Sequence, residues 1–163
     1  MSLKSLIVSC TLLVTFLFSS GIQAQTTIST HGPLTIEACV SFPSVSTSIP
    51  YSLTISETTS DGFAISGTDV SFQIALPANF TFSGTVSFSE TGDDISSISA
   101  NIDSDARYIL VTYTTTATNT LDVITLSGLS VVAASAAQSG NVTYLAGTAV
   151  INGLTSGDLF FPI

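Results

Sequence analysis

Apolar and polar residues alternate along most of the chain beyond residue 33. In the stretch LTIEACVSF, residues 34–42, every second side chain is apolar, and Thr, Glu, Cys and Ser fill the positions between. A period of two places alternate side chains on one face of a pleated strand. The pattern therefore predicts a strand with one apolar and one polar face.

The same alternation returns in later segments that are separated by turn-forming residues. These segments are YSLTIS, DVSFQIAL, GTVSFS, RYILVTYT, DVITLSGLSVVA and GNVTYLAGTAVING. Asp, Asn, Gly and Pro lie between them, as in Ser60-Asp61-Gly62 and Asn152-Gly153, and these residues favour turns. About seven to nine short strands without a helical period predict an all-β fold, an antiparallel β-sandwich.

Two residues inside this pattern predict local irregularities. Pro77 follows an apolar strand and lacks the N–H that ladder pairing requires, so it should end that strand. Phe80 and Phe82 then restart an inward-facing set. Gly128 interrupts a strongly apolar segment, which predicts a bulge or a close approach of two backbones.

The first 24 residues have the pattern of a cleaved export signal. Lys4 supplies a positive charge, LIVSCTLLVTFLF an apolar stretch, and SSGIQA a small-residue exit that ends at Ala24. Lipoprotein processing at Cys10 is an alternative, but the apolar run before it is very short. A retained membrane anchor is a second alternative, although the run is short for a span. We therefore expect a secreted or cell-surface protein without a membrane span after processing.

The chain divides into three parts on this interpretation. Residues 1–24 are the signal peptide, residues 25–33 a polar leader, and residues 34–163 a single β-sandwich domain. The leader is polar and ends in Gly32-Pro33, so we expect a loosely held tail. The part after the signal is long enough for one domain with its own core.

Charge excludes two classes of partner. After residue 24, Arg107 is the only Lys or Arg, against eleven Asp and Glu. Nucleic acid and anionic lipid surfaces both require basic residues that neutralise phosphate. Neither is expected as a partner.

Candidate catalytic residues are few. Cys39 and His31 are the only residues available for a thiol and its base, and His31 lies in the leader. The pattern G-x-S-x-G of a serine nucleophile is absent. Glu37, Glu57 and Glu90 remain as carboxylates for glycoside hydrolysis, but the chain has no Trp to form a sugar platform. We therefore expect no enzyme activity.

Cys39 shares its predicted strand face with polar residues, opposite the apolar set. Three interpretations remain open: an inert thiol covered by a bulge or by the leader, an intermolecular disulfide, and a reactive group. The inert thiol is favoured. An internal disulfide is excluded once Cys10 leaves with the signal peptide.

Calcium is the one cofactor that the sequence raises, and the favoured expectation is no cofactor. Asp93, Asp94, Asp103 and Asp105 flank the segment ISSISANI, and oxygen-rich loops suit a hard cation. The two loops would meet only if that segment folded back midway. Asp also favours turns without any metal, so we interpret these residues as turn formers.

Several segments together resemble a known kind of module. LTIEACVSF, LPANFTF, ITLSGLSVVAAS and GTAVINGL, in this order, are similar to a surface repeat module of large exported, adhesin-like proteins of Bacteroidota-type bacteria. The resemblance covers about residues 34–154. It implies an immunoglobulin-like or cohesin-like sandwich, a structural or adhesive role, and parent proteins that often leave by type IX secretion. The end of the chain, SGDLFFPI, does not resemble a type IX sorting domain.

The function predicted from the sequence is a secreted, non-enzymatic structural or adhesive module. Its partners would be other surface proteins or extracellular polysaccharide, and the protein itself is expected to be a monomer. One alternative is a carbohydrate-binding module in which exposed tyrosines stack on sugar, the candidates being Tyr51, Tyr108, Tyr113 and Tyr144. The other is a filament subunit that self-assembles by adding its leader as a strand to a neighbour's sheet.

Overall fold

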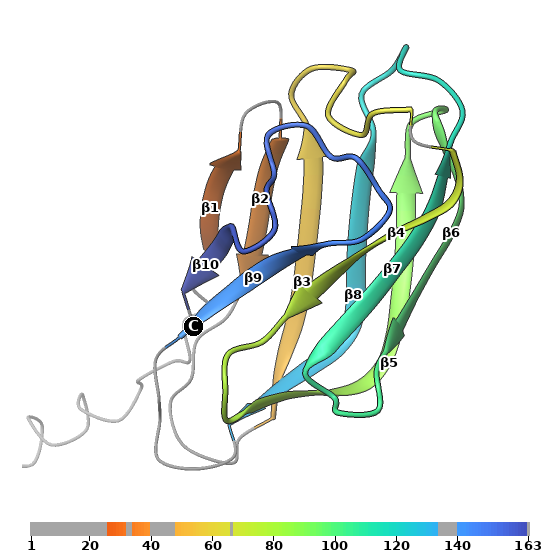
Figure 1. Ribbon diagram of the computed structural model, residues 1–163. Coiled ribbons are helices and arrows are strands. Elements are labelled where there is room, and N and C mark those ends of the chain that lie inside the picture. Colours follow the sequence, from red (N-terminus) through yellow and green to blue (C-terminus); the bar gives the residue numbers. More distant parts are fainter. Residues whose placement is uncertain (1–25, 32–33, 40–47, 66, 134–139, 163) are drawn as a thin grey trace, which may run out of the picture.

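A computed structural model describes residues 26–31, 34–39, 48–65, 67–133 and 140–162. These residues form ten β-strands in two sheets that lie face to face (Figure 1). All strand pairs are antiparallel. The prediction of an antiparallel β-sandwich is therefore confirmed. The described residues contain no helix with the length and apolar character needed to cross a membrane.

Each sheet has five strands. The first sheet has the order β1-β2-β3-β8-β5, with bounds Thr26–His31, Leu34–Cys39, Ser48–Glu57, Val123–Ala133 and Phe80–Thr91. The second has the order β10-β9-β4-β7-β6, with bounds Leu159–Pro162, Asn141–Ala146, Gly67–Ala75, Tyr108–Thr115 and Ile95–Ile102.

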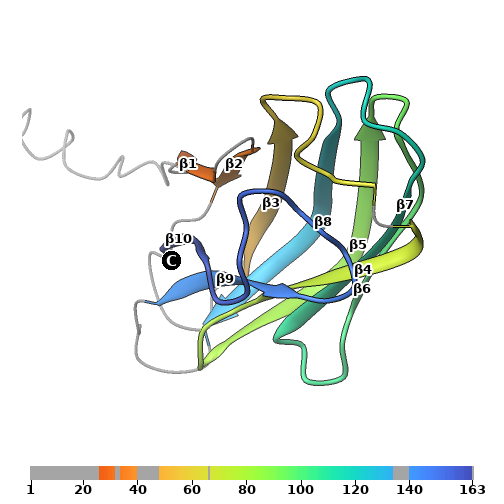
Figure 2. The same ribbon diagram turned by 45° about the horizontal axis from the view of Figure 1, so that its top comes forward.

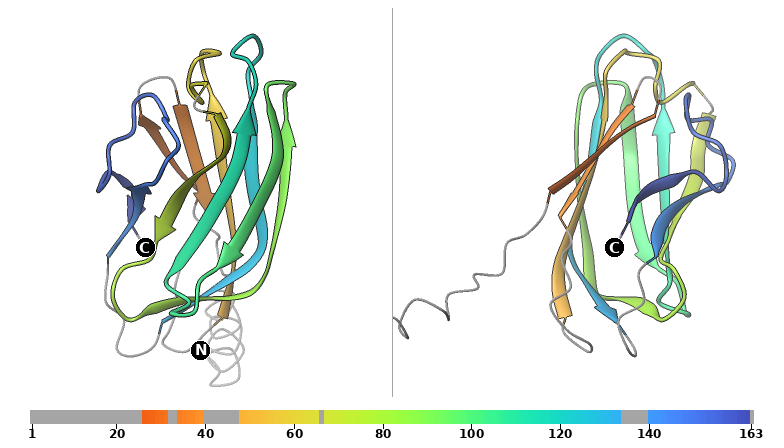
Figure 3. Two further views of the ribbon diagram at one scale, coloured as in Figure 1. Left: turned by 45° about the vertical axis from the view of Figure 1, so that its right-hand side comes forward. Right: turned by 90° about the vertical axis from the view of Figure 1, so that its left-hand side faces the viewer.

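The chain passes repeatedly from one sheet to the other. It crosses after β3, β4, β5, β7 and β8. Figures 2 and 3 show the connections that follow β4, β5 and β7 at the two ends of the layers. Strands that are distant in sequence, such as β3 and β8, thereby become neighbours. Loops from different parts of the chain consequently meet at each end of the sandwich.

Part of the predicted leader belongs to the fold. Thr26–His31 forms β1, which pairs with β2 from Thr26↔Cys39 to His31↔Leu34. The prediction of a loose tail is wrong for these residues, and the sandwich begins at Thr26 rather than at residue 34. A polar segment can form this strand because backbone hydrogen bonds to the neighbouring strand hold an edge strand in place.

The alternation of apolar and polar residues along the strands places the apolar side chains in the core, as the sequence predicts. In β3, Tyr51, Leu53 and Ile55 are buried while the residues between them are half-buried. The same holds for Phe72 and Ile74 in β4. These inward faces meet between the two sheets and form one hydrophobic cluster. Removal of this apolar area from water is the main stabilising contribution of the fold.

The prediction for Pro77 is also confirmed. Strand β4 ends at Ala75, two residues before Pro77, and β5 begins at Phe80. Phe80 and Phe82 are both buried. The alternation weakens farther along this edge strand, because Phe88 is 42% exposed although its register partner Leu126 is fully buried.

Gly128 lies at a bulge where β5 and β8 approach closely. The register of this pair shifts between Gly84 and Ser87, and both Gly84 and Gly128 have positive φ, 94° and 72°. A Cβ on Gly128 would lie 2.6 Å from the carbonyl oxygen of Thr85. The bulge also changes which positions of β8 face inward, from Ile124 and Leu126 to Leu129, Val131 and Ala133. The predicted irregularity is thus confirmed.

We expect Phe72→Ala to lower the free energy of unfolding by about 3 to 5 kcal/mol, because a fully buried ring leaves a cavity. Phe88→Ala is the matched control and should cost about 1 kcal/mol, since much of that ring is already in water. Urea denaturation measures both. Equal losses for the two variants would contradict the assignment of strand faces.

Gly128→Ala should destabilise the protein by about 2 to 4 kcal/mol, because the methyl group meets the backbone of β5 in an unfavourable φ region. Gly157→Ala is the control that separates the steric overlap with β5 from the strain of a positive φ. Gly157 also has positive φ, 97°, but a Cβ there has no atom within 4 Å, so only about 1 kcal/mol of conformational strain is expected. A Gly128→Ala variant as stable as Gly157→Ala would show that the crossing tolerates a side chain.

Candidate functional site

The tyrosines proposed for sugar stacking are mostly in the core. Tyr51, Tyr113 and Tyr144 are no more than 2% exposed, so the stacking interpretation is wrong for these three. They fall on the inward positions of their strands, where alternation buries them. Tyr108 is half-buried and lies next to the guanidinium of Arg107, 5.5 Å from its ring centroid.

The proposed calcium ligands do not converge. Asp93 and Asp94 precede β6, and Asp103 and Asp105 follow it. Because β6 is one continuous strand, Ile95–Ile102, the two pairs lie at its opposite ends and cannot share a cation. Asp103 instead accepts a hydrogen bond from the N–H of Tyr108 at 3.3 Å. Within the described part of the chain, no three His, Cys, Asp or Glu residues are grouped so as to hold a metal ion.

Cys39 and His31 are likewise separated. His31 pairs with Leu34 and Cys39 pairs with Thr26, at the two ends of the β1–β2 hairpin. Five residues of strand correspond to roughly 17 Å, so this arrangement does not form a thiol–imidazole pair. The side chain of Cys39 lies outside what the structure describes, and the three interpretations of its thiol stay predictions.

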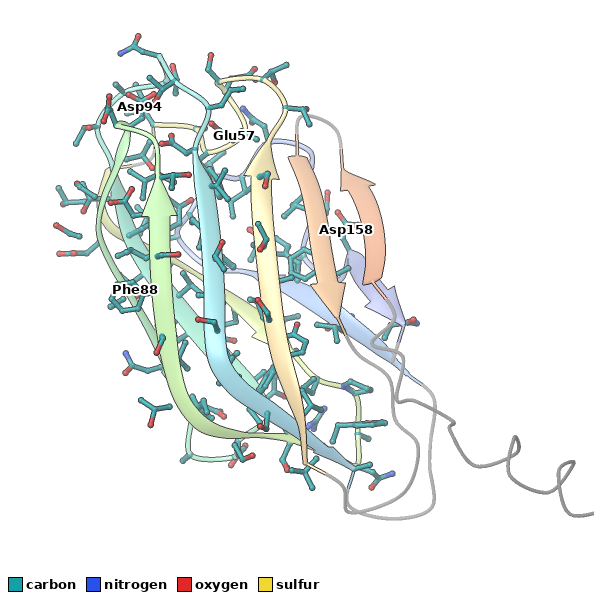
Figure 4. The ribbon with its side chains drawn as sticks, turned by 180° about the vertical axis from the view of Figure 1, so that it is seen from behind. Glu57, Phe88, Asp94 and Asp158 are labelled. Atoms are coloured by element: carbon teal, nitrogen blue, oxygen red, sulfur yellow. The ribbon has the colours of Figure 1, made fainter. Side chains whose placement is uncertain are left out.

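A different group of polar residues is buried at the end of the sandwich formed by the β3–β4, β5–β6 and β7–β8 connections. Glu57, Asp94 and Asp122 are 6%, 3% and 2% exposed. Figure 4 shows Glu57 and Asp94 at this end. We call these three residues the acidic latch. Ionisable side chains are seldom so deeply buried without a specific partner, and backbone N–H groups of the surrounding loops are the partners here.

Glu57 joins two connections that are distant in sequence. It ends β3, and its carboxylate accepts hydrogen bonds from the N–H of Phe63 at 2.6 Å and from the N–H of Asp122 at 2.8 Å. The N–H of Glu57 in turn donates to the carbonyl of Asp122 at 3.0 Å. One side chain thereby satisfies a backbone donor of the β3–β4 connection and another at the start of β8.

Asp94 holds the β7–β8 loop to the β5–β6 turn. Its Oδ2 accepts hydrogen bonds from the N–H groups of Asn119 and Thr120 and from the hydroxyl of Thr120. Its carbonyl accepts from the N–H of Thr116 at 2.9 Å. The hydrogen bond from the Thr120 N–H is the main cause that lowers the pKa of Asp94, and burial opposes it. Asp94 is therefore well suited to remain ionised.

Asp122 lies between these two carboxylates and is less well solvated by the protein. Its Oδ1 accepts one long contact, 3.4 Å, from the N–H of Asp94. Its side chain packs against Gly92, where any Cβ would overlap it. Burial, followed by the negative charges of Glu57, Asp94 and Glu90, raises the pKa of Asp122 to about 6, although the Asp94 N–H lowers it.

Among the described residues, the only Lys or Arg side chain is remote from the acidic latch. Arg107 lies beyond the far end of β6, where its Nη2 donates to the carbonyl of Leu76 at 3.1 Å. Both carboxylate oxygens of Glu57 and Oδ2 of Asp94 accept hydrogen bonds from backbone N–H groups, so the arrangement ties loops together. The sequence signal for Glu57 was its position, since it continues the inward parity of Tyr51, Leu53 and Ile55.

We expect Glu57→Gln to cost about 1 to 3 kcal/mol, because a glutamine leaves either the Phe63 or the Asp122 N–H without its acceptor. Glu90→Gln makes the same chemical change on an exposed side chain and should cost about 0.5 kcal/mol or less. The free energies of unfolding are measured by urea denaturation at pH 5, where Asp122 is mostly protonated and its charge contributes little. If both variants were equally stable, Glu57 would not be the tie described here.

Comparisons with known proteins identify no relative. Neither a scan against protein-family models, nor a search of curated proteins, nor a search of solved structures gave a match. The resemblance to surface repeat modules therefore stays a prediction from the sequence.

Proposed function

We propose that this protein is a secreted, non-enzymatic β-sandwich with a structural or adhesive role at a cell surface. Its export rests on the signal-like pattern of residues 1–24, which lie outside the described residues. Its contact surface is the outer face of the first sheet. The observation that carries the proposal is the composition of that face.

The outward positions of β3, β8 and β5 carry mainly hydroxyl groups and no charge. The register aligns them in rows, with Ser89 beside Thr125 and Thr125 beside Thr54. We call this set the hydroxyl face, and its members are Ser52, Thr54, Ser56, Ser87, Ser89, Thr91, Thr125 and Ser127. Figure 4 views the molecule from the side of these strands.

This surface suits contact with neutral, hydroxyl-rich polymers. Neighbouring strands are about 4.8 Å apart and alternate residues about 6.7 Å, so the hydroxyls form a closely spaced array of donors and acceptors. Thr54 and Thr125 already lie 3.4 Å apart, oxygen to oxygen. Within β3, β8 and β5, binding to such a face desolvates no charged side chain, whose removal from water is far more costly than that of a hydroxyl. The nearest charged position in the ladder is Glu37 of β2, in register with Thr54. The array can also serve as a passive, protease-resistant outer surface.

The separation of the candidate catalytic groups supports a non-enzymatic role. Cys39 and His31 lie at opposite ends of a hairpin, and Glu57 is buried with its oxygens bonded to backbone N–H groups. A functional acid or base has to reach its substrate. These groups are better explained as parts of the fold.

The two alternatives receive less support. A carbohydrate-binding module that stacks sugar on a row of tyrosines retains only Tyr108 among its candidates, because the other three are buried. A filament subunit that donates its leader would first have to free Thr26–His31, which pairs with β2 of its own chain. Both alternatives therefore require changes to the described arrangement.

The proposal predicts that the protein binds neutral polysaccharides through the hydroxyl face without altering them. Cellulose, xylan and dextran serve as probes in pull-down and affinity electrophoresis. Thr125→Arg places a long charged side chain at the centre of the face, so it should reduce binding at least about tenfold, a loss of roughly 1.4 kcal/mol. Circular dichroism checks that the variant is folded.

Thr112→Arg is the matched control. Thr112 is also half-buried and faces outward from the corresponding strand, β7, of the second sheet. It should leave binding unchanged. If only Thr112→Arg lost binding, the contact would lie on the second sheet. If the protein bound none of the probes, a polysaccharide-adhesive role would be contradicted. Release of reducing sugar would contradict the non-enzymatic assignment.

A further inference from the structure

The acidic latch connects three separate parts of the chain through buried carboxylates. Glu57 bonds the β3–β4 connection at Phe63 and the β7–β8 loop at Asp122. Asp94, in the β5–β6 turn, bonds the same loop at Asn119 and Thr120. The position of residues 116–122 therefore depends on carboxylates from both sides. Any change in the charge of this cluster acts on the whole end of the sandwich.

Every charged group that faces Asp122 carries the same sign. Glu57 approaches from β3, Glu90 from β5, and Asp94 from the β5–β6 turn, with exposed Asp93 beside it. Among the described residues, Arg107 bonds Leu76 beyond the far end of β6. His31 is at the acidic end of the first sheet, in register with Leu34, which itself pairs with Glu57, so it lies two strands away from Glu57. Like charges in a buried cluster disfavour simultaneous ionisation.

The contacts of Asp122 are suited to a neutral carboxyl group. Glu57 and Asp94 each accept at least two hydrogen bonds from backbone N–H groups, whereas Asp122 accepts one at 3.4 Å. A neutral carboxyl group loses little in such surroundings. A charged one lacks the donors that would replace water. Asp122 is thus the member of the cluster whose protonation decides whether the latch is stable.

We propose that the acidic latch is a proton-controlled device that holds the β7–β8 loop in place while Asp122 is protonated and loosens it when Asp122 ionises. The inference concerns the loop end of the sandwich and is independent of the hydroxyl face and of the proposed function. The loop carries Leu121, which is 54% exposed, so its release changes the apolar surface presented at this end.

The direction of the pH dependence follows from the opposite pKa shifts of Asp122 and Asp94. The pKa of Asp122 is raised from 3.8 to about 6, so its contribution to the stability of the latch is complete below about pH 4 and is lost as pH rises through about 6. The pKa of Asp94 is lowered, so its contribution is present above about pH 4 and is lost at lower pH. The latch should therefore be tightest near about pH 4, between the two opposing losses.

Amide hydrogen exchange of the purified protein tests this directly, followed by nuclear magnetic resonance. The informative amides are those bonded to the latch carboxylates, at Phe63, Asn119, Thr120 and Asp122. Their protection factors, corrected for intrinsic exchange, should fall about tenfold between pH 5 and pH 8, because only the part of the shift from 3.8 to about 6 that lies above pH 5 acts in this range. A carbon-detected titration of the Asp122 carboxyl group gives its pKa independently of folding.

Asp122→Asn is the decisive variant, because it keeps the Oδ1 acceptor and the shape but cannot ionise. It should retain the pH 5 protection up to pH 8. Asp93→Asn removes one exposed negative charge from the same turn and should preserve the pH dependence. The proposal is overturned if Asp122 titrates near its ordinary value, if protection does not change with pH, or if the change persists in Asp122→Asn.

Discussion

The fold depends on the burial of aromatic and aliphatic side chains between two sheets whose inward positions match. Phe72, on the central strand β4, packs against Tyr113 of β7 and Tyr144 of β9, with ring centroids 6.1 and 5.8 Å apart. Tyr113 also meets Phe63 from the β3–β4 connection at 5.7 Å. These contacts join the second sheet to a crossing segment. Large rings supply much of the apolar area that such a core removes from water.

That packing requires each strand to present apolar side chains to the core along its length. Where the apolar positions change from even to odd numbers, a bulge keeps them facing inward. In β8 the inward set changes parity at Gly128, so that Leu126 and Leu129 both reach the core. The neighbouring strands shift register at the same level, between Tyr51 and Leu53 and between Gly84 and Ser87. A strand pair that approaches so closely needs glycine because a Cβ would overlap the opposite backbone.

Polar side chains lie in two places, on the outer face of the first sheet and at the end of the sandwich that holds the acidic latch. They differ in their exposure to water. Hydroxyls on the first sheet are surface groups that exchange hydrogen bonds with water at little cost, which favours a contact role for that face. The acidic latch is buried, so each of its carboxylates requires a donor. Glu57 and Asp94 obtain donors from backbone amides, and Asp122 obtains them only in part. The same burial that organises the loops therefore makes one of them sensitive to protonation.

The amino-acid pattern alone predicts the class of fold, the main strands, the parity of their core residues, the strand end before Pro77 and the irregularity at Gly128. These are local consequences of alternation and backbone chemistry, which act over a few residues. It did not determine β1, because a polar edge strand is fixed by its ladder and not by its own pattern. It also assigned Tyr51, Tyr113 and Tyr144 to a possible surface, whereas their burial depends on which sheet covers them. Only the tertiary structure brought Glu57, Asp94 and Asp122 together, because hydrogen bonds between residues far apart in sequence leave no local periodicity.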